Sequence, residues 1–214
     1  MKAHRPDPLI CGLYAITPAV DDSPDGTMRL LVAARAAIEG GARVVQYRNK
    51  TAPHANRLEH ALGLAAVCEK FGAIFIVNDD VDLALDVDAD GVHLGKADGA
   101  IASARARIGP KRLLGASCYN DLALATAAHQ AGADHIAFGS VFASSTKPGA
   151  LRAPLGLFSE AKSLGLPMVA IGGVTHQNAA AVIAAGAHAV AVIADLFDAP
   201  DIRARAAQFA VLFK

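Results

Sequence analysis

The sequence predicts an α/β fold in which eight parallel strands close into a (β/α)8 barrel, the TIM-barrel architecture. Short apolar runs alternate with longer, alanine-rich amphipathic segments along the 214-residue chain, as strands alternate with helices in such folds. Glycines recur where the helical segments end, as in EGGA (39–42) and AAGA (184–187), where a left-handed residue is often needed. This repeat fits one barrel, so we expect residues 1–214 to form a single catalytic domain.

Eight runs are the expected strands. Each is short and almost continuously apolar, as buried parallel strands are when helices cover them. They are LICGLYAI (9–16), RVVQYR (43–48), AIFIVN (73–78), DGVHL (90–94), RLLGAS (112–117), DHIAFG (134–139), PMVAIG (167–172) and HAVAVIA (188–194).

Helices are expected between these runs, for example over 28–39, 54–71 and 120–131. The apolar stretch 179–194 is shorter than the roughly 18 residues of a membrane span, so we interpret it as a helix that leads into the last strand. An open doubly wound sheet is the alternative fold. It often binds a dinucleotide, yet no GxGxxG follows any strand, and neither a P-loop nor an HExxH motif occurs.

The composition excludes several classes of protein. Twenty basic and 20 acidic residues give a net charge of zero, which argues against nucleic-acid and membrane partners. Three cysteines without a CxxC pair argue against a zinc site or a disulfide framework. The N-terminal region lacks a signal-peptide pattern, so a cytoplasmic protein is expected. The oligomeric state stays open, a homo-oligomer included.

Polar residues follow several of the expected strands, at the end where barrel enzymes hold their active sites. Gln46, Arg48 and Lys50 are spaced by two, so in an extended segment they share one face, suited to a polar ring and an anion. Asn78 and Asp79 close the third strand, with Asp98 after the fourth and Ser117 after the fifth. Two carboxylates on adjacent strand ends suit Mg²⁺, although helix capping by Asp80 or Asp98 explains such residues equally well.

The loop 144–150 after the sixth strand is rich in Ser, Thr, Gly and Pro and contains Lys147. It is suited to folding over a phosphate, although a surface loop has the same composition. The segments IGGVT and VIADL follow the seventh and eighth strands, where barrels often bind phosphate through backbone N–H groups. His93 and His135 are interpreted as core residues rather than bases. His54, His60, His129 and His176 are interpreted as helix-surface or cap residues.

Taken together, these segments resemble the thiamine phosphate synthase family across nearly the whole chain. The similarity lies in LYAIT (13–17), VVQYRNK (44–50), FIVNDDVDLAL (75–85), ADGVHLGKAD (89–98), GAS (115–117), FGSVFASSTK (138–147) and AIGGVTHQNA (170–179).

The resemblance implies that a pyrimidine-methyl pyrophosphate loses pyrophosphate and that the nitrogen of a thiazole phosphate captures the resulting cation. Such chemistry needs charge stabilisation and orientation rather than a strong base. The resemblance assigns Gln46 to the pyrimidine and favours Asp79 and Asp98 as Mg²⁺ ligands. It assigns the pyrophosphate to Arg48, Lys50, Asn78, Ser117 and Lys147, and the thiazole phosphate to Ser144, Thr146, Gly173, Ile193 and Ala194.

The chain departs from the family pattern at a few positions. Tyr47 and Asn49 stand where the family commonly has Leu and Glu, and by period two both point away from the Gln46 face. Ala194 stands where the family often has Ser, which removes a side-chain donor for the thiazole phosphate.

Two rival functions share these features. One is a thiazole tautomerase on the same fold, which would not need the residues for Mg²⁺ and pyrophosphate. The other is a non-catalytic protein that binds thiamine phosphate.

Overall fold

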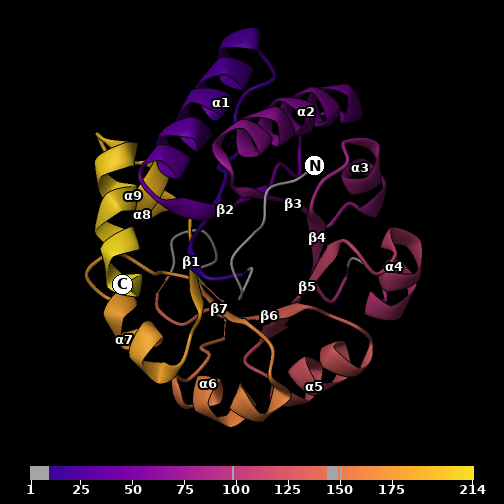
Figure 1. Cartoon of the computed structure of the whole chain (residues 1–214), viewed down its shortest axis with the longest axis vertical. Helices are drawn as coiled ribbons and strands as arrows, with labels where there is room; N and C mark the ends of the chain where they lie inside the picture. Colours follow the sequence, from indigo (N-terminus) through magenta and orange to yellow (C-terminus); the bar gives the residue numbers. More distant parts are fainter. Residues whose placement is uncertain (1–9, 98, 144–148, 150) are drawn as a thin grey trace.

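In a computed structural model, residues 10–97, 99–143, 149 and 151–214 are described. Eight parallel strands form a closed ring in sequence order, and the last strand pairs with the first (Figure 1). The predicted barrel is therefore confirmed. The strands are β1 (Gly12–Ile16), β2 (Ala42–Tyr47), β3 (Ile74–Asn78), β4 (Gly91–Leu94), β5 (Leu113–Tyr119), β6 (His135–Phe138), β7 (Met168–Ile171) and β8 (Ala189–Val192).

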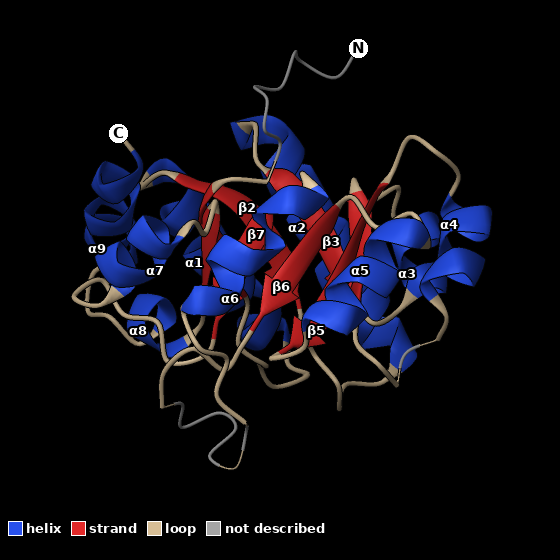
Figure 2. Cartoon of the chain, turned by 90° about the horizontal axis from the view of Figure 1, so that it is seen from below, coloured by secondary structure: helices blue, strands red, loops and turns tan. Residues whose placement is uncertain are grey.

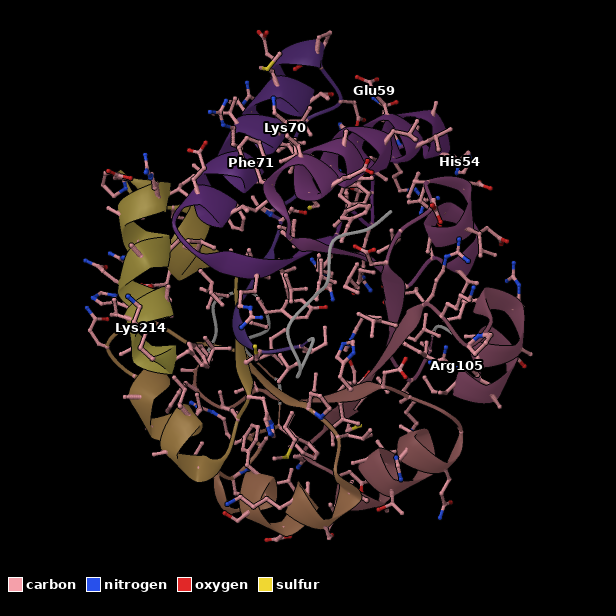
Figure 3. All side chains as sticks on the ribbon, in the orientation of Figure 1. His54, Glu59, Lys70, Phe71, Arg105 and Lys214 are labelled. Atoms are coloured by element: carbon pink, nitrogen blue, oxygen red, sulfur yellow. The ribbon has the colours of Figure 1, made fainter. Side chains whose placement is uncertain are left out.

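Helices surround the ring of strands on its outside (Figures 1 and 2). Charged and polar residues of α2, such as His54, Glu59 and Lys70, are exposed on the outer side of this layer (Figure 3). The α-helices are α1 (Pro24–Glu39), α2 (His54–Phe71), α3 (Val81–Asp86), α4 (Ile101–Ile108), α5 (Leu122–Gln130), α6 (Gly156–Glu160), α7 (Ala179–Ala185), α8 (Ala194–Phe197) and α9 (Ile202–Ala210), and the 3-10 helices are η1 (Ala161–Leu164) and η2 (Val211–Phe213). In the described part of the chain, no helix has the length and apolar character that crossing a bilayer requires.

Local signals explain where the helices begin and end. The Ser23 hydroxyl accepts a hydrogen bond from the Gly26 amide at 3.0 Å, so α1 begins at Pro24, four residues before its expected start. Proline is favoured in the first helical turn because its missing N–H is not needed there. Gly72 and Gly186 end α2 and α7 in the left-handed conformation expected of helix-terminal glycines.

The end of the last strand differs from the sequence prediction. The apolar run 188–194 was expected to be strand throughout, but β8 ends at Val192. Ile193 has φ −116° and ψ −86°, and α8 begins at Ala194. An apolar run has no period that distinguishes a strand from a buried helical turn, so the pattern could not locate this boundary.

The barrel has an apolar interior and a second apolar layer between strands and helices. Tyr14, Ile16, Val44 and Ile76 belong to the interior cluster. On the neighbouring strand β8, Ala191 pairs in register with Tyr14, and its small side chain leaves room for the aromatic ring. Residues that alternate with the interior ones point outward and pack against the helices.

One histidine was misplaced by the sequence prediction. His60 was expected on a helix surface or at a cap, but it is fully buried, and its Nδ1 lies 3.1 Å from the hydroxyl of Tyr47. The structure therefore corrects that prediction, because the inner face of α2 packs on the outside of β2. The same contact shows Tyr47 pointing outward from the barrel, as predicted.

Candidate active site

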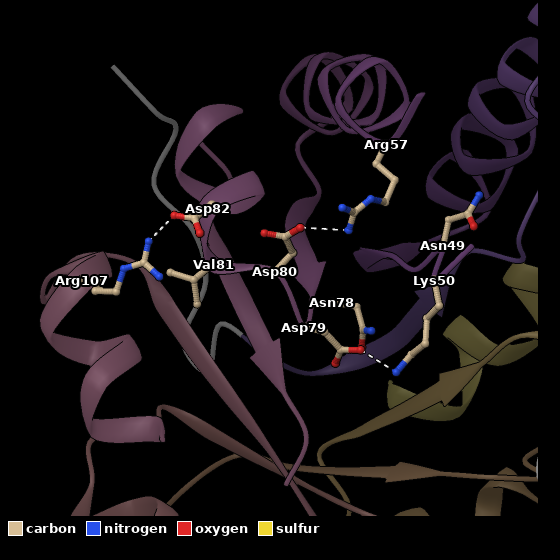
Figure 4. Close-up of a pocket in the computed structure, with 9 residues that line it drawn as sticks. All are labelled: Asn49, Lys50, Arg57, Asn78, Asp79, Asp80, Val81, Asp82 and Arg107. Atoms are coloured by element: carbon tan, nitrogen blue, oxygen red, sulfur yellow. Dashed lines mark hydrogen bonds and ion pairs between the residues drawn. The ribbon is translucent and has the colours of Figure 1, made fainter. Parts of the chain in front are cut away.

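A pocket of about 450 Å³ lies at the carboxyl ends of β2 and β3. It is polar, and its cationic and anionic side chains come from both strand ends and from α2, α3 and α4 (Figure 4). Its lining residues are Asn49, Lys50, Arg57, Asn78, Asp79, Asp80, Val81, Asp82 and Arg107. Three residues predicted from sequence for an active site, Lys50, Asn78 and Asp79, therefore line one pocket.

Asp79 points across the pocket to the neighbouring strand end. It has φ +66°, a conformation that Asp tolerates better than most residues, and its amide donates to the carbonyl of His93 at 2.8 Å. Its carboxylate lies 2.6 Å from the ammonium of Lys50 (Figure 4). The ion pair brings one predicted metal ligand and one predicted pyrophosphate-binding cation together.

Asp80 has a structural role beside Asp79. Its carboxylate caps α3 by accepting a hydrogen bond from the Leu83 amide at 2.9 Å, and it forms a 3.0 Å ion pair with Arg57. The capping alternative thus holds for Asp80, whereas Asp79 does not cap the helix. Asp98, the second expected metal ligand, lies outside the described residues.

Gln46 lies in the barrel interior, only 3% exposed. Its side-chain amide donates a hydrogen bond to the hydroxyl of Tyr14 at 2.8 Å, which leaves the amide oxygen available to another polar group. Burial raises the pKa of Tyr14, partly offset by its hydrogen bond with Gln46, so the phenol stays neutral.

The chain after Gln46 is held by short-range hydrogen bonds. The amide of Arg48 donates to the hydroxyl of Thr17 at 3.1 Å, which ties the end of β2 to the end of β1. The Asn49 side-chain oxygen accepts from the amides of Thr51 and Ala52, both at 3.2 Å. Asn49 therefore forms the turn that projects Lys50 into the pocket.

Ser117 on β5 is only partly buried, and its hydroxyl lies 2.9 Å from Nε2 of His93 on β4. Nδ1 of His93 in turn lies 3.4 Å from Nε2 of His135 on β6. Both histidines are buried, as predicted, and burial is the main reason that the pKa of His135 lies well below its usual range.

The loops after β6 and β7 approach each other closely. The Phe142 amide donates to the carbonyl of Gly172 at 2.9 Å, and a Cβ at Gly173 would overlap the carbonyl of Ala143. Gly173 has φ +65°, which glycine adopts without strain. Its backbone carbonyl accepts from the side chain of Asn178 at 3.0 Å, so this turn has one defined shape.

The expected thiazole phosphate residues are described only in part. Ile193 and Ala194 follow the carboxyl end of β8. Ile193 precedes helix α8, and Ala194 is the first residue of that helix. The carboxylate of Asp195 forms an ion pair with the guanidinium of Arg205, with 2.7 Å between Oδ1 and Nη1. Ser144, Thr146 and Lys147 lie outside the described residues.

Sequence reasoning missed three residues around this site. Arg57 reaches the pocket from the first turns of α2, a position with no motif. Tyr14 and His93 lie within apolar strands; His93 was interpreted as core, and no role was predicted for Tyr14. The two-residue period of a strand predicts which of its side chains face the barrel interior. Applied to the polar residues inside apolar runs, this period indicates that Tyr14 and His93 face inward.

The chain is similar to known proteins along nearly its whole length. The family described as "Thiamine monophosphate synthase" matches residues 13–196. The thiamine-phosphate synthase of Methylobacillus flagellatus is 54% identical over 206 residues, which cover 96% of this chain and 97% of that protein. That of Aromatoleum aromaticum is 52% identical over 209 residues, covering 97% and 99%.

A solved structure is also similar to this chain over most of its length. The solved structure of a thiamine phosphate pyrophosphorylase from Pyrococcus furiosus superposes with a TM-score of 0.83 at 35% sequence identity, and the match covers 95% of each chain. The (β/α)8 barrel, the polar pocket at its carboxyl rim and this full-length similarity agree, and the chain therefore belongs to the thiamine monophosphate synthase family.

Proposed function

We propose that the chain is a thiamine-phosphate synthase. It joins 4-amino-2-methyl-5-hydroxymethylpyrimidine pyrophosphate to hydroxyethylthiazole phosphate or its carboxylated form. The C–O bond to pyrophosphate breaks and its electron pair leaves with the pyrophosphate. The thiazole nitrogen then supplies the electron pair of the new C–N bond, and a carboxylated thiazole also loses CO₂.

One observation carries this proposal beyond family membership. Lys50, Asn78 and Asp79 come from two strand ends and line the same pocket, together with Arg57. Cations and an amide bind a pyrophosphate, and they lower the barrier most where they meet the charge that develops on the leaving group. The arrangement suits the departure of a polyanion rather than proton abstraction.

Mg²⁺ is part of the proposal, with Asp79 and Asp98 as the residues that would hold it. The carboxylate of Asp79 fits this role because its side chain is 24% exposed at the pocket and because Mg²⁺ prefers carboxylate and phosphate oxygens. Bound Mg²⁺ would neutralise part of the pyrophosphate charge. The Lys50–Asp79 ion pair keeps both side chains at the pocket.

Gln46 is proposed to bind the pyrimidine. Tyr14 accepts one hydrogen from its amide, which fixes the orientation of the amide group. The oxygen of Gln46 can then accept from the exocyclic amine of the pyrimidine, and its second N–H can donate to a ring nitrogen. Arg48 is proposed to bind the pyrophosphate, and Ser117 to lie beside it.

The other substrate is proposed to bind on the opposite side of the rim. Backbone groups of Gly173, Ile193 and Ala194, with the hydroxyls of Ser144 and Thr146, would hold the thiazole phosphate. Lys147 is proposed to contact the pyrophosphate as it leaves. The defined turn at Gly173 supports this assignment, since backbone donors bind an anion best when they are fixed beforehand.

The test is to incubate the protein with both substrates and Mg²⁺ and to measure thiamine phosphate and pyrophosphate. We expect the two products in equal amounts, and none when either substrate is left out or when a chelator removes the metal. Absence of product from the complete mixture would overturn the proposed activity. Isomerisation of the thiazole phosphate without the pyrimidine would instead indicate the tautomerase.

We also propose the partners and the cellular location of the enzyme. Its partners are the two phosphorylated small molecules, and neither nucleic acid nor a membrane is involved. We propose a cytoplasmic location because both substrates are strongly charged and do not cross a bilayer unaided.

A further inference from the structure

Three polar side chains form a hydrogen-bonded row inside the barrel. It starts at His135, which is fully buried, continues through His93, which is 8% exposed, and ends at the partly exposed Ser117. The contacts are 3.4 Å between the two imidazoles and 2.9 Å between His93 and the Ser117 hydroxyl. Only the last member is accessible to a ligand.

A glycine makes room for the two rings. Gly115 on β5 pairs in register with His93 on one side and with His135 on the other. A Cβ at this position would overlap Nε2 of His135 and Nδ1 of His93. The imidazole contact therefore depends on the absence of a side chain at Gly115, and Ser117 lies two residues further along the same strand face.

The hydrogen bonds of the row can run in either of two directions, from His135 to Ser117 or from Ser117 to His135. The position of the proton on the His135 ring decides between them. Its Nδ1 is buried and has no hydrogen-bond partner among the described residues. If Nδ1 carried the proton, the ring would bury an N–H without an acceptor, which is rarer in proteins than an acceptor without a donor. The ring is neutral, because burial holds its pKa well below the usual range. The single proton then belongs on Nε2.

That choice fixes the rest of the row. Nε2–H of His135 donates to Nδ1 of His93, which must then be unprotonated. The proton of the His93 ring lies on Nε2 and is donated to the oxygen of Ser117. Every N–H on the two rings then has an acceptor, which the opposite direction does not achieve.

We propose that His93 is a positioning residue, whose Nε2–H bond to the Ser117 oxygen leaves the serine hydroxyl hydrogen free to point at an anionic leaving group. His135 acts through His93 by fixing its tautomer. The inference rests on the proposed function, since it takes the pyrophosphate as the anion near Ser117. A hydroxyl that accepts one hydrogen bond also donates a stronger one, because hydrogen bonds in a chain polarise each other.

Nitrogen-15 NMR of the free protein tests the tautomers without any substrate. Signals of His93 and His135 are assigned from spectra of His93→Gln and His135→Gln. We expect both rings at pH 7.5 to be neutral and protonated on Nε2. Protonation of His93 on Nδ1, or of both of its nitrogens, would overturn the proposal whether or not the protein makes thiamine phosphate.

A double-mutant cycle tests the consequence for catalysis. Ser117→Ala and His93→Leu should each lower kcat by roughly 10²-fold, the usual loss for one donor to a developing anion, and the double variant should lose little more. His93→Gln, whose side-chain amide can replace the Nε2 donor, should retain more activity than His93→Leu. Independent losses that multiply in the double variant would show that His93 does not act through Ser117.

His60 offers a matched control. It is also a fully buried histidine, but it bonds Tyr47 on the outer side of the barrel. His60→Leu should lower the melting temperature without changing kcat, and it should leave the His93 and His135 signals in place. Loss of kcat comparable to that of His93→Leu would mean that any buried histidine has this effect, which contradicts the proposal.

Discussion

The hydroxyl of Tyr14 on β1 accepts a 2.8 Å hydrogen bond from the side-chain amide of Gln46 on β2, inside the barrel. The contact joins Tyr14, for which the sequence predicted no role, to a residue that the family resemblance assigns to the pyrimidine. The orientation of the Gln46 amide therefore depends on a neighbour that would not itself touch the substrate.

Replacing Tyr14 by Phe should release the amide of Gln46. We expect KM for the pyrimidine pyrophosphate to rise and KM for the thiazole phosphate to change little. The free energy of unfolding should fall by about 1 kcal/mol for the lost hydrogen bond. Gln46→Ala should show the same selective effect more strongly, and equal weakening of both substrates in calorimetry would contradict the assignment.

Tyr47→Phe is the control for that variant. Tyr47 is equally buried and its hydroxyl also has one partner, His60, but on the outside of β2. Tyr47→Phe should therefore lower the free energy of unfolding without changing KM for either substrate.

Asp79 and Asp80 are adjacent, yet they should respond differently to substitution. Asp79→Ala should abolish Mg²⁺-dependent turnover while the fold survives, because a metal-binding carboxylate would be removed. Asp80→Ala should lower the free energy of unfolding by about 1 kcal/mol through loss of the helix cap. The Mg²⁺ concentration for half-maximal rate should stay unchanged in Asp80→Ala. If Asp79→Ala turned over as fast as the wild type at limiting Mg²⁺, the metal assignment would be wrong.

Lys147 should act on the leaving group. A cation that meets the departing pyrophosphate stabilises the transition state more than the bound substrate, so Lys147→Ala should lower kcat by roughly 10²–10³ with a smaller change in KM. Single-turnover measurement of C–O cleavage checks this, with the exposed Lys162 on η1 as the control substitution. An unchanged cleavage rate would remove Lys147 from the mechanism.

Gly173→Ala should disturb the thiazole phosphate side of the rim. The new Cβ would overlap the carbonyl of Ala143, so the loops after β6 and β7 must separate, and KM for the thiazole phosphate should rise. Gly165→Ala is a matched control, because Gly165 has a similar φ of +68° but no atom of the described residues within 4 Å of the added Cβ. Both variants carry the cost of the left-handed conformation, and only Gly173→Ala should change KM.

The sequence predicted the barrel because strand and helix patterns are local and repeat along the chain. It predicted the polar strand ends for the same reason, and Lys50 and Asp79 do meet there. It named Asp80 as a possible helix cap, which the structure confirms, but it could not predict the positive φ of Asp79, because no local pattern requires it. It also could not relate His93 to His135, since the contact between their rings depends on the missing side chain of Gly115.

The pairing of β8 with β1 joins opposite ends of the chain, with Ala189 beside Gly12. During synthesis β1 therefore lacks its second neighbour until β8 has been made. Contacts of such large sequence separation slow folding, because the loop must close before they can form. An incomplete chain exposes the unpaired edges of β1 and of its last completed strand, which can pair with other chains. Closure of the ring is thus the step that pairs both edges and leaves neither available to another chain.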